Sequence, residues 1–125
     1  MADNQQKLGG EAVDPPAPLV RYALYLTNLY FKTAHLVAKW MSVGFTHGVL
    51  NTDNLSLASI TIDYGPFGFL DSYDPNFIPN HSDDGGRYDY ESQPSICLWN
   101  LGRLAVALTP ILSSKFSKTI NVLTN

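Results

Sequence analysis

One apolar stripe through residues 19–43 is the longest periodic feature of the sequence and the strongest constraint on its fold. Apolar side chains recur there every three or four residues, which is the period of one face of an α-helix. The members are Val20, Ala23, Leu24, Thr27, Tyr30, Phe31, Ala34, Val37, Ala38 and Met41. We therefore predict a helix from Leu19 to about Val43 that ends at Gly44, because glycine readily adopts the left-handed conformation that closes helices.

The stretch after this helix predicts little regular structure. Residues 45–54 are too polar for an element and are predicted to form a loop. Residues 55–62 alternate apolar with small polar side chains, which predicts a short strand or a tight hairpin. Residues 66–94 are rich in Gly, Pro, Asp and Asn and predict a long irregular segment, and a loop of this length inside a compact domain is usually functional.

A second helix is predicted from Ile96 to about Leu108, with Ser95 as its N-cap and Pro110 as its end. Residues 1–18 are polar and then proline-rich, and we interpret them as a disordered lead-in. The tail, residues 110–125, has no clear period. The fold class predicted from these segments is mainly α with one small β-hairpin.

Composition excludes several classes of protein. The 125 residues suffice for one small domain, and an apolar content of 45% argues against disorder. Only 15% of residues are charged. We therefore expect an apolar face that a missing partner would cover. The net charge of -3 lacks the basic surface that nucleic-acid binding requires. The single cysteine, Cys97, excludes an internal disulfide and predicts a small buried thiol.

No apolar run approaches the length needed to cross a bilayer, and residues 1–10 match neither a signal peptide nor a transit peptide. We therefore expect no membrane partner and take the cytosol as the default location.

Two carboxylates and an amide, Asp53, Asn54 and Asp63, flank the predicted hairpin. Oxygen ligands of this kind hold Mg²⁺ against nucleotide phosphates, and a nearby carboxylate can deprotonate an attacking hydroxyl. An Asp-Asn pair more often caps a turn, and Asp63 could equally be a turn residue. The flanking residues favour the interpretation as ligands.

The spacing of these residues is similar to that of two protein-kinase motifs. Residues 47–54 have the length of the catalytic loop His-x-Asp-x-x-x-x-Asn, and Asp63-Tyr64-Gly65 matches the metal-binding Asp-Phe-Gly. Val49 stands where a kinase has its catalytic aspartate and cannot accept a proton. Asp53 is the only acid left in the loop for the role of base, and we interpret His47 as a structural hydrogen-bonding residue.

Four motifs in this order resemble the selenoprotein O (YdiU) family. They are His-Gly-Val-Leu-Asn-Thr-Asp-Asn (47–54), Ile-Asp-Tyr-Gly-Pro-Phe-Gly-Phe-Leu-Asp (62–71), Asn-His-Ser-Asp (80–83) with Gly86-Arg87-Tyr88, and Gln93-Pro94 followed by Leu98-Trp99-Asn100-Leu101. The resemblance runs from about residue 19 to residue 108. It implies that residues 19–109 form part of the C-terminal lobe of a kinase-like (pseudokinase) fold, followed by a divergent tail.

The resemblance also implies a protein adenylyltransferase that transfers AMP from ATP to Ser, Thr or Tyr hydroxyls of proteins, with Mg²⁺ or Mn²⁺ as cofactor. Carried over by motif position, Asp53 is the catalytic proton acceptor. Asn54 and Asp63 are the metal ligands, and Asp63 also contacts the nucleotide through the metal. The family is mitochondrial in eukaryotes and cytoplasmic in bacteria.

Members of this family are several hundred residues long, and their nucleotide pocket needs a glycine-rich loop and a lysine that Lys7-Leu8-Gly9-Gly10 cannot supply. We therefore expect an enzyme fragment that is inactive in isolation. The alternatives are a non-catalytic fragment that binds a partner or itself through apolar helices, and a reading frame without a role.

Several other side chains have simpler interpretations. The acids of the long loop, Asp71, Asp74, Asp83, Asp84 and Asp89, lack the spacing of a calcium loop and are interpreted as solvated. Arg87 could pair with one of these acids or with a phosphate, and the acid is favoured. Trp99 and Leu101 are interpreted as packing residues.

Overall fold

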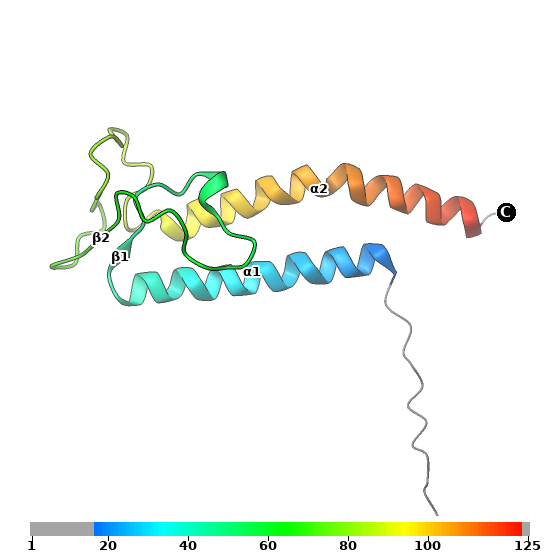
Figure 1. Ribbon diagram of the computed structural model, residues 1–125, viewed down its shortest axis with the longest axis horizontal. Helices are drawn as coiled ribbons and strands as arrows, with labels where there is room; N and C mark the ends of the chain where they lie inside the picture. The colour runs from blue at the N-terminus through cyan, green and yellow to red at the C-terminus, as the bar shows by residue number, and fades with distance from the viewer. Residues whose placement is uncertain (1–16, 124–125) are drawn as a thin grey trace, which may run out of the picture.

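Within the described residues, two antiparallel α-helices form the body of the molecule, and the loops that join them gather at one end (Figure 1). The computed structural model describes residues 17–123, with side chains as far as residue 110. Helix α1 spans Pro18–Ser42 and helix α2 spans Gln93–Leu123. Between them lie strand β1 (Phe45–Thr46), a 3-10 helix η1 (Thr52–Asn54) and strand β2 (Gly68–Phe69). The predicted lead-in lies outside the described residues up to residue 16.

Helix α1 confirms the prediction from the apolar stripe to within one residue at each end. It starts with Pro18, whose missing N–H costs nothing in the first turn. It is followed by Gly44, whose φ of +69° is the predicted left-handed conformation. A Cβ on Gly44 would also lie 3.2 Å from the Cβ of Leu70, so the position needs glycine for space as well.

The prediction of which face of α1 is buried is wrong, because only Val37 of the predicted stripe is fully buried and the buried face is rotated away from that stripe. Leu29, Thr33, Val37 and Trp40 are buried, whereas Leu24 and Phe31 are 59% and 74% exposed. The helix packs on one side only, against α2 and the loops, and most of the predicted stripe faces solvent. On α2, Leu98 and Val106 are exposed in the same way.

The prediction of a strand or hairpin in residues 55–62 is wrong, because this segment is irregular. The antiparallel pair forms instead between β1, in the stretch predicted as a loop, and β2, with Phe45 opposite Phe69 and Thr46 opposite Gly68. Two polar side chains of residues 55–62 bond to α1 rather than to a neighbouring strand, Ser59 to Thr33 and Thr61 to Trp40. Trp40 Nε1 donates to Thr61 Oγ1 at 2.9 Å.

The predicted ends of the second helix are also wrong. Helix α2 begins at Gln93 rather than after Ser95, and it continues through Pro110 to Leu123. Proline removes one backbone donor, which a long helix can tolerate at a cost of about 3 kcal/mol. The Thr109 hydroxyl donates to the carbonyl of Ala105 at 3.1 Å beside this point.

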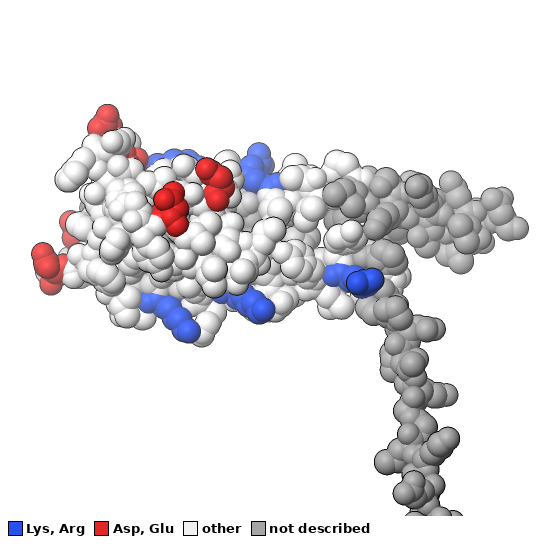
Figure 2. Space-filling model, viewed as in Figure 1, with Lys and Arg blue, Asp and Glu red and all other residues white. Residues whose placement is uncertain are grey.

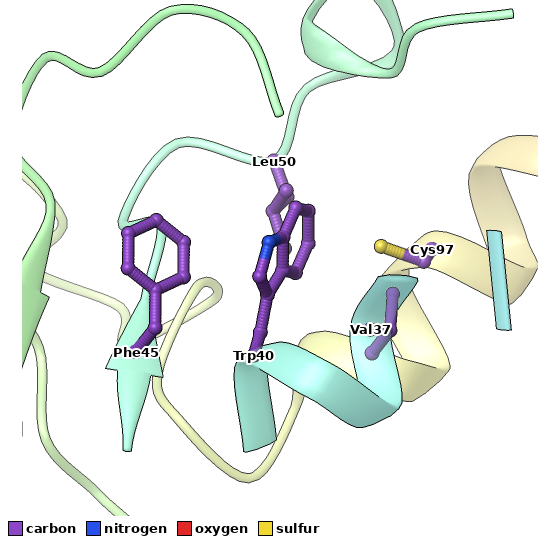
Figure 3. Packing of buried hydrophobic residues seen from close by; sticks show 5 residues of the cluster. All are labelled: Val37, Trp40, Phe45, Leu50 and Cys97. Carbon is purple, nitrogen blue, oxygen red and sulfur yellow. The ribbon is translucent and has the colours of Figure 1, made fainter. Parts of the chain in front are cut away.

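The core lies where the C-terminal end of α1, the loop after β1 and the first turns of α2 meet. Figure 3 shows Trp40 between Phe45 on one side and Val37 and Cys97 on the other, with Leu50 against its ring. The Trp40 and Phe45 ring centroids are 5.6 Å apart. Burial raises the pKa of the Cys97 thiol to about 12, which confirms the prediction of a buried thiol.

Charge is divided between the two parts of the molecule. In the described residues, every Asp and Glu lies between positions 53 and 91, whereas the helices carry only Lys and Arg. Figure 2 shows the acidic side chains gathered toward the loop end and the basic ones along the helices. No helix in the described part of the chain is long and apolar enough to span a membrane.

Candidate functional site

The loop at residues 45–51 is held by side-chain amides that reach it from three other parts of the chain. Each amide nitrogen donates to a backbone carbonyl of this loop. The pairs are Gln93 with Phe45 (2.9 Å), Asn80 with Gly48 (3.2 Å), Asn54 with Val49 (3.0 Å) and Asn100 with Leu50 (2.9 Å). The loop has almost no regular secondary structure, and these amides take the place of a strand partner for its buried carbonyls.

Gln93 makes two of the contacts that position this loop. Its side chain is fully buried, and besides its bond to Phe45 its Oε1 accepts the backbone N–H of His47 at 2.9 Å. A single side chain thus satisfies a donor and an acceptor two residues apart, as a neighbouring strand would. This arrangement anchors the start of the loop to the first turn of α2.

His47 connects the two halves of the candidate site. Its buried ring places Nε2 2.8 Å from the carbonyl oxygen of Ile62, and Nδ1 accepts the N–H of Val49 at 3.4 Å. The two contacts together require the tautomer with the proton on Nε2. The prediction of a structural histidine is confirmed, and its bond fixes the residue before Asp63 against the loop that leads to Asp53.

Gly48 lets this loop pack against the turn that follows Asp63. Its φ is +80°, and a Cβ there would lie 2.9 Å from the carbonyl oxygen of Pro66 and 3.0 Å from Cγ of Pro79. Any side chain at position 48 would therefore separate the two segments that carry the predicted site residues.

Asp53 and Asn54 lie in η1, directly after the anchored loop. The Asn54 amide nitrogen is committed to Val49, so its Oδ1 is the atom available to a ligand. The Asp53 side chain is exposed, and no hydrogen bond or ion pair engages it in the described part of the chain. Both residues are thus held on a fixed turn with free side-chain oxygens.

Asp63 has a backbone conformation that is uncommon for a residue with a side chain. Its φ is +54°, and its carbonyl accepts the N–H of Gly65 at 2.8 Å in a tight turn. Such conformations cost of order 1–3 kcal/mol and cluster at functional sites. Its carboxylate is exposed and has no protein partner among the described residues.

The donor set suits a hard divalent cation. No group of three or more His, Cys, Asp and Glu able to hold a metal occurs among the described residues. The candidate set is instead an amide oxygen and a carboxylate, from Asn54 and Asp63. Mg²⁺ commonly takes one or two protein oxygens of this kind and completes its shell with phosphate and water. The residues therefore fit the ion, and its shared coordination by this pair stays a prediction.

Sequence reasoning assigned no role to Gln93, Asn80 or Asn100. A signal was present, because Gln93 and Asn100 lie seven residues apart on the face of α2 that also carries Cys97 and Leu101. Polar residues on an otherwise apolar buried face need a partner.

The acids of the long loop are only partly solvated, since the carboxylates of Asp74, Asp83 and Asp89 accept backbone N–H groups.

Comparison with known proteins gives the class of this chain. Residues 5–122 match the family described as Protein adenylyltransferase SelO, and the chain therefore belongs to this family of protein nucleotidyltransferases. The matched range is wider than residues 19–108, where the sequence motifs lie.

Among the relatives are proteins named Protein nucleotidyltransferase YdiU from Salmonella schwarzengrund (strain CVM19633), Salmonella agona (strain SL483) and Salmonella typhi. Each is 59% identical to this chain over 92 residues, which is 74% of the chain and 19% of the relative. The chain thus spans about a fifth of the length of the curated relatives it matches.

Proposed function

We propose that this chain carries the metal-binding and catalytic segment of a protein adenylyltransferase, which transfers AMP from ATP to Ser, Thr or Tyr hydroxyls of other proteins. One observation carries the proposal. The side chains of Asp53, Asn54 and Asp63 keep free oxygens on turns whose backbones are tied together through His47. The order of helix, anchored loop, aspartate turn, long irregular segment and helix supports a kinase-like C-terminal lobe for residues 19–109.

In this proposal Asn54 and Asp63 hold Mg²⁺ or Mn²⁺, and the bound ion offsets the negative charge on the phosphate oxygens. Asp53 accepts the proton of the attacking hydroxyl, a role for which its carboxylate is exposed and unpaired. The hydroxyl oxygen forms a bond to the α-phosphorus. The bond from that phosphorus to the bridging oxygen breaks, and pyrophosphate leaves with the electron pair.

The buried amides contribute by holding the reacting groups in place before the nucleotide arrives. Gln93 and Asn100 fix the loop that leads to Asp53, and His47 fixes the residue before Asp63. Preorganised geometry of this kind lowers the entropic part of a reaction barrier. The chain supplies these groups, whereas the elements that cradle the nucleotide in the proposed reaction come from outside it. We expect no AMP transfer by the chain alone.

Metal affinity tests this proposal without requiring turnover. Free Mn²⁺ is counted by electron paramagnetic resonance while the chain is titrated, first alone and then with Mg²⁺ as competitor. We expect D63A and N54A each to weaken Mn²⁺ binding by about tenfold or more, since each removes one of few ligands. D71A, which removes another exposed acid of the loop region, should bind like the parent chain. Equal affinity in the parent chain and D63A would contradict the proposal.

Exposed apolar side chains favour a second candidate function, binding of a partner through the helices. Both helices expose large apolar side chains to solvent. They are Leu19, Val20, Leu24, Tyr25 and Phe31 on α1, and Leu98, Trp99 and Val106 on α2. Surfaces of this kind usually become buried in a complex or a larger protein. This role does not need the metal site and is compatible with it.

A further inference from the structure

Trp99 on α2 is not the packing residue that the sequence suggested. It is 48% exposed, and two guanidinium groups lie over its ring, with Cζ of Arg87 at 5.1 Å and Cζ of Arg103 at 5.3 Å from the centroid. Arg87 is also 5.7 Å from the ring of Tyr88. The favoured interpretation of Arg87, pairing with an acid, is wrong because its guanidinium contacts aromatic rings.

Neither guanidinium has a carboxylate partner within the part of the chain that the structure describes. Asp83, four residues before Arg87, uses its two oxygens to accept the backbone N–H groups of Arg87 and Tyr88. The ring of Trp99 offsets part of the cost of holding two like charges together. The arginine N–H donors stay available, and each guanidinium can grip a carboxylate with two parallel bonds.

These arginines lie beside the proposed catalytic turn. The Tyr88 hydroxyl donates to Oδ1 of Asn51, which is the N-cap of the 3-10 helix that carries Asp53. Arg103 also borders a groove of about 280 Å³ between η1 and α2. The groove, which we term the arginine groove, is lined by Thr52, Leu55, Leu57, Asn100, Arg103, Leu104 and Ala107.

We propose that the arginine groove binds an extended segment of the protein substrate. An acidic side chain of that segment pairs with Arg87 and Arg103, and a neighbouring apolar side chain lies against Leu55, Leu57 and Leu104. The inference rests on the proposed function and names its substrate class, hydroxyl residues that have acidic and apolar neighbours. A nucleotide base fits this surface poorly, because guanidinium groups already occupy the ring of Trp99.

Nuclear magnetic resonance on the ¹⁵N-labelled chain tests this inference with two synthetic probes. One is the peptide Gly-Leu-Glu-Glu-Ser-Gly, and the other replaces both glutamates with glutamine. We expect the acidic peptide to shift the indole N–H of Trp99 and the amides of residues 52–57 and 103–107 in a saturable way. The indole of Trp40, buried and bonded to Thr61, serves as internal reference and should stay in place.

The amide peptide should bind at least about tenfold more weakly, because a charge-assisted pair is replaced by neutral bonds. R87Q and R103Q should each lose a similar factor, whereas R21Q, which removes an exposed arginine of α1, should bind like the parent chain. Equal affinity for both peptides, or parental affinity in R87Q and R103Q, would overturn the inference.

Two further outcomes would also overturn it. Shifts of the Trp99 indole caused by ATP alone, with displacement of the peptide, would assign the arginines to phosphate. Shifts of residues 52–57 that grow with protein concentration in the absence of peptide would assign the groove to a second copy of the chain. The proposed metal ligands are other residues, so the two proposals fail separately. A parent chain that binds Mn²⁺ as expected but does not bind the acidic peptide would contradict this inference and would not contradict the proposed function.

Discussion

At the scale of single residues, sequence spacing was enough to nominate Asp53, Asn54 and Asp63 and to give His47 a structural role. It was not enough to find the side chains that hold these residues in position. Gln93 bonds to His47, 46 positions earlier in the sequence, and to Phe45, 48 positions earlier. Both partners are backbone groups, which have no sequence signature. Contacts of this kind become visible only once the chain is folded.

Replacing Gln93 with leucine should destabilise the fold by about 2–4 kcal/mol. The change keeps the volume but leaves the buried N–H of His47 and the buried carbonyl of Phe45 without partners, and each such loss costs about 1–3 kcal/mol. Urea unfolding followed by circular dichroism measures the loss. S95A, which changes an exposed hydroxyl in the same turn of α2, should stay within about 0.5 kcal/mol of the parent. Similar free energies of unfolding for Q93L and S95A would contradict the role of Gln93 in holding the loop.

Cys97 should make stability fall at alkaline pH. Burial raises its pKa from 9.0 to about 12, so the folded chain retains a proton that the unfolded chain releases. The contribution of the buried thiol is complete below pH 9 and is lost as the pH rises toward 12. The difference in free energy of unfolding between the parent chain and C97A should therefore shrink over this interval. A difference that is constant with pH would show that the thiol ionises freely in the folded chain.

At the scale of elements, the sequence predicted the ends of α1 well but its buried face and the strands poorly, and the reason is the range of the determining interactions. Helix α1 follows from a local period of apolar residues, and its end follows from Gly44. The two-residue strands exist only because Phe45 meets Phe69, a pairing across 24 residues that no local pattern encodes. Helix α2 passes Pro110 because proline weakens a long helix without necessarily ending it.

Two glycines provide a matched test of the loop packing. G48A should destabilise the chain by at least about 1–2 kcal/mol, since it combines a φ of +80° with a contact of 2.9 Å to the carbonyl of Pro66. G102A should instead stabilise it by up to about 1 kcal/mol, because Gly102 lies within α2 and has no atom within 4 Å of its added Cβ. Thermal unfolding of both variants decides the point, and a neutral G48A would contradict the described packing.

At the scale of the whole molecule, the chain combines the loops of the proposed metal site with two helices whose apolar faces are uncovered. The exposed apolar faces of α1 and α2 were expected from the low charge content, and the structure confirms their exposure. Their partner could not be predicted, because an apolar surface specifies area and shape without specifying identity.

We propose that the chain associates with itself through these faces when no other partner is present. Sedimentation velocity should then show a mean mass that rises with concentration. F31E, which places a charge on the exposed face of α1, should shift the molecule toward monomer without loss of stability. Y73E alters a loop side chain with the same 74% exposure and should leave association unchanged. A parent chain that stays monomeric at high concentration would exclude this mode of association.

The central claim is that Asp53, Asn54 and Asp63 surround one divalent ion, and paramagnetic broadening by Mn²⁺ tests it most directly. Trace Mn²⁺ added to the ¹⁵N-labelled chain broadens amide signals according to their distance from the ion. The account predicts that the signals of residues 53, 54 and 63 disappear together, that Mg²⁺ restores them, and that D63A abolishes the effect at all three positions. Broadening centred on the acids of residues 71–89, or at position 53 without position 63, would contradict it.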